Sequence, residues 1–193
     1  MAMTSKYGFV YKRHLIPNVE TPASLEVILA NSAGPLTVGD AVKYNDGGYL
    51  AGCEIDKAML GILVGFVTEK GENIFKSKED HGGTESGDDT FTAANDNITI
   101  HKVKGVVIVD TMALFQAYNA DALTQAECGL WFNGVVADGT YVDGTTGTGA
   151  TYSAGTQQFQ LIELVTVLDD GSASTTTGLF RIGRSQLATD TTI

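Results

Sequence analysis

The apolar residues of this chain come in short runs that end at glycine, asparagine or aspartate, and this spacing constrains the fold most. Residues 60–67 read LGILVGFV, a run of strand length. Such a run suits a strand buried on both faces, or a barrel strand bent at its glycines. Upstream, residues 45–48 read NDGG, which accept the positive φ of a tight hairpin turn. We therefore predict that residues 36–68 form the core of a small antiparallel barrel.

Further strand-length runs follow along the chain, and long stretches of helical periodicity are missing. They lie at residues 25–30, 97–109, 130–132, 159–167 and 179–184. Glycine is abundant, with 23 residues against three prolines, as in β proteins with many turns. One short helix of two turns is predicted over residues 121–129, between an Asp121 N-cap and Gly129. The fold class predicted is all-β: a small antiparallel β-barrel or sandwich with little helix.

The order of these runs predicts one domain with additions at both ends. No domain linker is visible in the sequence, so residues 25–185 are expected to form a single barrel or sandwich domain. Two polar stretches, 69–97 and 133–157, are expected to be long exposed loops inserted into it. Residues 1–24 are predicted to form an extended N-terminal arm, and residues 186–193 a tail.

The arm holds the candidate contact residues. Aromatic and small residues alternate near its start, a pattern that could pair as an edge strand, and the densest basic spot of the chain follows. Pro17 and Pro22 keep the next segment out of helix. A docking arm of this kind would reach a neighbouring subunit, whereas the alternative is a solvated turn at residues 12–14. The residues expected to contact a partner or a neighbouring subunit are Tyr7, Phe9, Tyr11, Lys12, Arg13 and His14.

Charge is spread unevenly along the chain. The formal net charge is −11, and residues 105–180 contain no lysine or arginine. The acids of that half are Asp110, Asp121, Glu127, Asp138, Asp143, Glu163, Asp169 and Asp170. Such a surface repels phosphate and anionic membranes, so direct nucleic-acid binding by this half is not expected. The simpler interpretation is an acidic surface that only aids solubility.

Membrane insertion and secretion are not expected either. No apolar run approaches the roughly 20 residues that span a bilayer, and the N-terminus lacks an apolar signal core. Synthesis in the host cytoplasm fits this pattern. Cys53 and Cys128 are too few for a disulfide framework and are expected to be buried thiols, although a single bridge between them stays open.

Motifs of catalysis and metal binding are missing from the sequence. Neither Gly-x-Ser-x-Gly nor His-Glu-x-x-His occurs, and the three histidines are far apart. The spacing of Asp80, His81, Asp88 and Asp89 fits neither an EF-hand nor a zinc site. Residues 144–149 lack the lysine of a phosphate loop. We therefore expect no enzyme, no cofactor and no metal; the alternative is an enzyme whose acids come together only in space.

Two sets of segments resemble structural proteins of tailed-phage heads. Residues 38–42 (VGDAV) followed by 59–66 (MLGILVGF) resemble the layout of small head decoration proteins. A second set is similar to capsid-associated proteins, with Thr111 where that family usually has proline. It comprises residues 109–110 (VD), 114–117 (LFQA), 126–130 (AECGL), 158–164 (QFQLIEL) and 180–182 (FRI).

The resemblance implies a decoration or auxiliary head protein without catalytic residues, located in the virion on the outer capsid surface. Its partners would be the major capsid protein and copies of itself, most simply a homotrimer. Because packaged DNA repels an acidic face, we expect the acidic half to point outward and the basic arm to lie against the shell. The alternative function is a glycan- or receptor-binding module of a phage fibre or tail, using the loop at 133–157.

Overall fold

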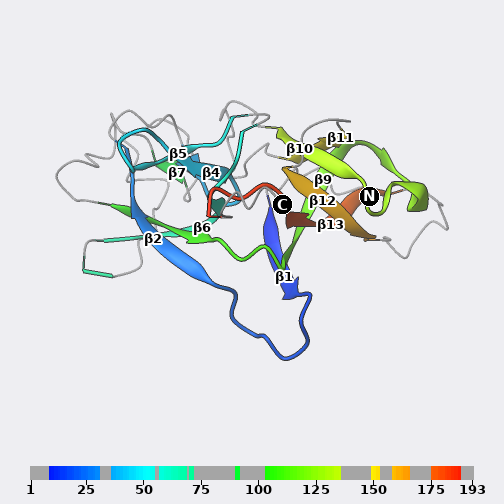
Figure 1. The fold of residues 1–193 in the computed structure, drawn as a ribbon, viewed down its shortest axis with the longest axis horizontal. Coiled ribbons are helices and arrows are strands. Elements are labelled where there is room, and N and C mark those ends of the chain that lie inside the picture. The colour runs from blue at the N-terminus through cyan, green and yellow to red at the C-terminus, as the bar shows by residue number, and fades with distance from the viewer. Residues whose placement is uncertain are drawn as a thin grey trace, which may run out of the picture.

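The computed structural model of the chain describes a set of β-strands with their turns. The described residues are 9–30, 36–54, 57–68, 70–71, 90–91, 103–135, 149–152, 158–165 and 175–187. The protein is all-β and consists mainly of two sheets, which confirms the predicted fold class. Figure 1 shows the five-stranded sheet on the left, the six-stranded sheet on the right, and β1 between them.

The five-stranded sheet is antiparallel throughout and contains the segment predicted to be the core. Its strands, in spatial order, are β2 (Ser24–Ile28), β8 (Lys104–Ile108), β6 (Gly61–Val67), β4 (Ala41–Tyr44) and β5 (Leu50–Gly52). The predicted turn at residues 45–48 joins β4 to β5, with the Asn45 side chain accepting hydrogen bonds from the amides of Gly47 and Tyr49. A small additional sheet pairs β3 (Leu36–Thr37) with β7 (Thr90–Phe91).

The six-stranded sheet curls back on itself, because the last strand of its spatial order also pairs with the second. Its strands, in spatial order, are β1 (Val10–His14), β9 (Ala113–Leu123), β11 (Gly149–Tyr152), β10 (Trp131–Val135), β12 (Phe159–Leu164) and β13 (Thr175–Ile182). Strand β9 also pairs with β13, while its link to β11 is a single parallel bridge, Ala150 to Asn119. One bridge is no continuous strand pairing, so the predicted barrel is not closed. The two-sheet arrangement is consistent with the predicted sandwich.

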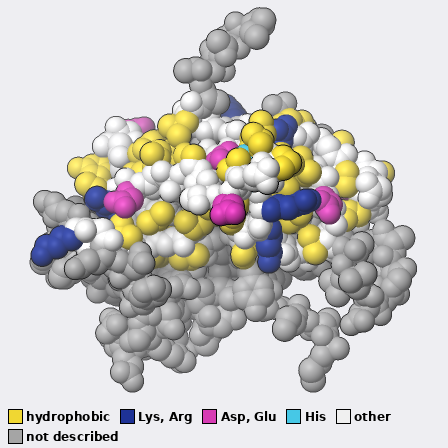
Figure 2. Space-filling view, turned by 90° about the horizontal axis from the view of Figure 1, so that it is seen from below, with side chains coloured by type: hydrophobic (Ala, Val, Ile, Leu, Met, Phe, Trp, Pro, Cys, Tyr) yellow, Lys and Arg dark blue, Asp and Glu magenta, His cyan; other side chains and the backbone are white. Residues whose placement is uncertain are grey.

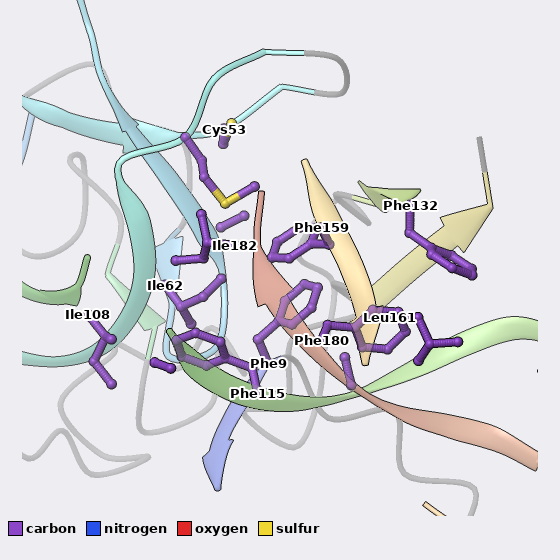
Figure 3. Packing of buried hydrophobic residues seen from close by; sticks show 14 of the residues in the cluster. Phe9, Cys53, Ile62, Ile108, Phe115, Phe132, Phe159, Leu161, Phe180 and Ile182 are labelled. Carbon is purple, nitrogen blue, oxygen red and sulfur yellow. The ribbon is translucent and has the colours of Figure 1, made fainter. Parts of the chain in front are cut away.

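A shared cluster of buried side chains joins the two sheets (Figure 3). From the five-stranded sheet and its connections come Ala41, Cys53, Met59, Ile62 and Ile108. From the six-stranded sheet and the residue before it come Phe9, Ala113, Phe115, Ala117, Leu123, Phe132, Phe159, Leu161, Phe180 and Ile182. Backbone bonds cross the same junction: the Met59 amide donates to the Arg184 carbonyl at 3.0 Å, and the Gln186 amide to the Met59 carbonyl at 2.7 Å. The two sheets therefore share one apolar interior where they meet.

The two glycines of β6 serve different purposes. A Cβ atom built on Gly61 would lie 2.0 Å from the carbonyl oxygen of Ile108, so only glycine permits β6 and β8 to approach this closely. Gly65 follows a β-bulge at Val64 and has open space around it. Of the two interpretations of this run, the strand buried on both faces is confirmed, because the adjacent residues Ile62 and Leu63 are both fully buried. Gly61 is required by backbone contact, and Gly65 marks the bulge.

The helix predicted over residues 121–129 is wrong in its first half. Residues up to Leu123 extend β9, because Leu123 pairs with Thr175 of β13 and the added strand pairing outweighs a weak local helix signal. Only one turn of 3-10 helix remains, at Gln125–Glu127. Its cap is Thr124, whose amide and hydroxyl both donate to the Glu127 carboxylate, rather than Asp121.

The glycines of β6 provide a matched test of this geometry. We expect Gly61→Ala to lower the free energy of unfolding by about 1–3 kcal/mol or more, because backbone must move to admit the methyl group. Gly65→Ala should change it by less than about 1 kcal/mol, since nothing lies in the way. Urea unfolding followed by tryptophan fluorescence measures both, and equal losses would contradict the close approach of β6 to β8.

Candidate functional site

Two of the aromatic residues predicted as contacts of the arm, Phe9 and Tyr11, pack against the protein's own core. The third, Tyr7, lies outside the described residues. Phe9 is only 1% exposed and stacks on Phe159 with ring centroids 4.2 Å apart. Tyr11 is half-buried and meets the Phe115 ring edge-on at 6.2 Å. The alternation seen in the sequence is thus real, but the aromatic face points inward.

Strand β1 is an edge strand, as the alternation of aromatic and small residues predicted, and its partner strand lies in the same chain. It pairs antiparallel with β9, Val10 opposite Gln116 and His14 opposite Ala113, so it belongs to the six-stranded sheet. Burying Phe9 and pairing β1 offset the entropy of ordering this segment without a neighbouring subunit. The part of this segment that stays exposed to a partner is therefore the outer side of β1 and the loop that follows it.

The basic residues of β1 have three different environments. The register between β1 and β9 shifts at Lys12, so Lys12 lies in a β-bulge and is exposed. Arg13 donates to the Glu163 carboxylate of β12, and because both side chains are more than half exposed this ion pair adds little stability. His14 turns inward, and its side chain is 4% exposed.

His14 and Asp110 fasten the loop between β1 and β2 to the corner between β8 and β9. Nε2 of His14 lies 3.0 Å from Oδ2 of Asp110, and Nδ1 accepts the Ile16 amide at 2.9 Å. Asp110 also accepts the amides of Met112 at 2.9 Å and Ala23 at 3.3 Å. Both ends of the loop are therefore tied to one carboxylate.

The same contacts set the charge of Asp110. Burial alone would raise its pKa, but the hydrogen bonds from Met112, Ala23 and His14 outweigh burial and hold the pKa below its ordinary value of 3.8. Asp110 is therefore ionised throughout the neutral and mildly acidic range. The stability that these bonds supply is present above about pH 4 and is lost only as the pH falls through the lowered pKa.

This pair does not form a catalytic site with the groups that touch it. Both ring nitrogens of His14 are engaged, one by a carboxylate and the other by a backbone amide. Neither group bonded to the ring, the Asp110 carboxylate or the Ile16 main chain, is a hydroxyl or thiol nucleophile that a general base would activate. The pair acts on the shape of the loop.

Exposed apolar side chains gather around this corner and form what we call the β1–β2 face. They come from β1, the loop after it, β2 and the β8–β9 corner: Val10, Leu15, Ile16, Leu25, Ile28 and Met112. Ile16 is the most exposed of them, at 54%, and the Leu15 amide donates to the Met112 carbonyl at 2.9 Å. Figure 2 looks at the molecule from this side and shows hydrophobic groups interspersed with charged and other polar groups. Contiguous apolar surface marks contact sites on proteins, and we therefore take this face as the candidate contact surface.

Two strand edges lie at the same face. β1 and β2 are each the terminal strand of their sheet, so within the described chain one edge of each has no strand beside it. A terminal edge presents backbone donors and acceptors to a partner. The β1 edge is interrupted by the bulge at Lys12, whereas β2 pairs with β8 over its whole length without a shift.

A buried polar contact that the sequence did not indicate holds the connection after β5. Gln158, at the start of β12, donates through Nε2 to the carbonyls of Glu54 at 2.9 Å and Lys57 at 2.7 Å. It also contacts Sγ of Cys53, whose pKa is raised to about 11 chiefly by burial. Cys128 is half-buried, and both thiols are free. Cys53 is thus a structural thiol, and the bridge left open by the sequence is not formed.

The remaining sequence candidates lie outside the described residues: Asp80, His81, Asp88, Asp89 and most of the loop at 133–157. Within the part of the chain that the structure describes, no three His, Cys, Asp or Glu side chains gather as a metal site would require. No helix in that part is both long and apolar enough to cross a membrane.

Comparison with known proteins gives no relative. No family model, no curated protein and no solved structure matches this chain. The resemblance to tailed-phage head proteins therefore rests on the short segments quoted above.

The burial of Phe9 predicts a large effect of its removal. We expect Phe9→Ala to lower the free energy of unfolding by about 3–5 kcal/mol, because the substitution leaves a cavity against Phe159 and Phe180. Val10→Ala is the matched control: its side chain is 45% exposed, and the loss should stay below about 1 kcal/mol. Chemical unfolding measures both. A Phe9→Ala protein as stable as the unchanged protein would show that this segment is an arm independent of the core.

The two thiols should differ in reactivity. In the folded protein near pH 7.5, Cys128 should react with a water-soluble thiol reagent at least about tenfold faster than Cys53, which is buried and stays protonated. The single variants Cys53→Ala and Cys128→Ala assign the two phases, and denaturant should make the rates similar. Fast labelling of Cys53 in the folded state would contradict its packing against Gln158.

Proposed function

We propose that this chain is a virion structural protein that binds the outer surface of a phage capsid and stabilises it. The observation that carries the proposal is the β1–β2 face, where exposed apolar side chains and two terminal strand edges occur together. A face of this composition suits a protein partner, because burying apolar surface drives association and strand edges can receive an added strand. The segments that resemble head decoration proteins support the same class of function.

The proposed partner is the major capsid protein, with copies of this chain arranged as a homotrimer or another homo-oligomer. Lys12 lies exposed on β1, and of the acids in residues 105–180 Asp110 and Glu163 bind side chains of β1, while the others add negative charge elsewhere in the chain. Packaged DNA repels such a charge, so the β1–β2 face would lie against the shell and the acidic surface outside. In this proposal the protein is made in the host cytoplasm and ends on the virion surface.

The proposal assigns no enzymatic role. A stabilising capsid protein needs contact area and rigidity rather than reactive groups. The described residues supply both, through the shared core and the tied loop between β1 and β2. The glycan-binding alternative depends on the loop at 133–157, most of which the structure does not describe.

The test adds recombinant protein back to purified virions from which this chain has been stripped. We expect Ile16→Asp to weaken rebinding at least about tenfold, because a charge at the centre of an apolar contact costs more than about 1.4 kcal/mol. Tyr49→Asp is the control, since Tyr49 is 47% exposed but lies in the β4–β5 hairpin, away from the β1–β2 loop in Figure 1. Cryo-electron microscopy of the rebound particle locates the protein.

Density on the outer shell together with selective loss in Ile16→Asp would support the proposal. Density on a tail or fibre would overturn it in favour of a receptor-binding module. Equal rebinding by both variants would show that the β1–β2 face is not the contact.

A further inference from the structure

The hydrogen bonds of His14 define its tautomer. An amide N–H can only donate, so Nδ1 of His14 must accept the bond from Ile16 and carries no proton. The proton of the neutral ring is therefore on Nε2, which donates to Asp110. This arrangement holds only while the ring is neutral, because a second proton would go to Nδ1.

Ile16 offers Nδ1 both kinds of partner. Its amide nitrogen lies 2.9 Å from Nδ1, and its carbonyl oxygen lies 3.3 Å from the same atom. A neutral ring needs the amide donor, whereas a protonated ring needs the carbonyl acceptor. One residue thus supplies a partner for each charge state of the ring.

We propose that protonation of His14 exchanges its Nδ1 partner from the Ile16 amide to the Ile16 carbonyl and thereby makes the β1–β2 face respond to pH. The side chain of His14 is almost fully buried, so an Nδ1–H group facing an amide N–H would be left without an acceptor. The main chain at Ile16 is the element that can move, because Ile16 lies outside the strands, at the start of the loop, and its side chain is exposed.

Several charged groups lie in the segments around the His14 ring. Asp110, from the β8–β9 corner, is the charged group in contact with the ring and stays ionised at neutral and mildly acidic pH. The other charges of the surrounding segments are Lys12 and Arg13 on β1, Glu20 in the loop, and Glu163 on β12, which binds Arg13. Of the side-chain types named here, imidazole is the one whose ordinary titration falls between about pH 5 and 8.

The consequence for docking rests on the proposed function. Leu15 and Ile16 belong to the β1–β2 face, so a rotation of the peptide at Ile16 alters the apolar surface offered to the shell. The exchange itself is a property of the isolated chain, and it can be tested without a capsid.

The test is an NMR titration of the ¹⁵N-labelled protein from pH 8 to pH 5. We expect the Ile16 amide resonance to shift with the same midpoint as the His14 ring, while the amides of Gly47 and Tyr49, which bind Asn45, stay unchanged. His14→Gln assigns the transition among the three histidines and should abolish it at Ile16. Asp110→Asn keeps the shape of the carboxyl group without its charge, and in this variant too the Ile16 amide should follow the His14 ring with the same midpoint.

Two results would overturn the proposal: a His14 ring that titrates while the Ile16 amide does not respond, or an Ile16 transition that persists in His14→Gln. If His14→Gln fails to fold, Asp110→Asn decides, and an Ile16 amide whose midpoint differs from that of the His14 ring in this variant counts against the exchange. Rebinding to stripped virions at pH 8 and pH 5.5 is a separate measurement. If the protein rebinds at neither pH while the titration is positive, the docking function is overturned and the exchange is not.

Discussion

The burial of Phe9 where the two sheets meet is the contact on which the rest of the structure depends. Its ring stacks on Phe159 of the six-stranded sheet and shares a cluster with Met59 and Ile62 of the other. Its amide donates to the Gly39 carbonyl at 3.0 Å, so the backbone is tied to the turn before β4 as well. These contacts fix where β1 begins, and the position of β1 in turn fixes the loop and the β1–β2 face.

The sequence was informative where the signal is local. Alternating and continuous apolar runs located most strands, and residues 45–48 identified a hairpin, because side-chain periodicity and turn chemistry act over a few residues. The partners of those strands were not predictable: Phe9 lies 150 residues from Phe159 in the chain, and nothing near it distinguishes a buried aromatic face from an exposed one. The weak helix signal at residue 121 gave way to pairing with β13 for the same reason.

The candidate site shows the same division. The basic spot at residues 12–14 was visible in the sequence, but its three side chains differ because of a bulge, an ion pair with Glu163 and a buried bond to Asp110. His14 and Asp110 are 96 residues apart, and Gln158 is 105 residues from Cys53. Exposure of Ile16 and Met112 could not be deduced either, since composition does not say which apolar residues stay outside the core.

The two terminal strand edges are not equivalent, and this difference limits how a partner can bind. A bulge and an exposed lysine protect the β1 edge against pairing, which is a common device at sheet edges. The β2 edge is regular, but immediately after it the Ala30 amide donates to the Leu50 carbonyl of β5, so the sheet curls back on itself there. An added strand therefore has room only along Ser24–Ile28, about 17 Å at the usual rise per residue. So short a pairing is weak by itself. Stable docking at this face must then draw most of its free energy from the apolar side chains around Ile16, whose position depends on the bond between His14 and Asp110.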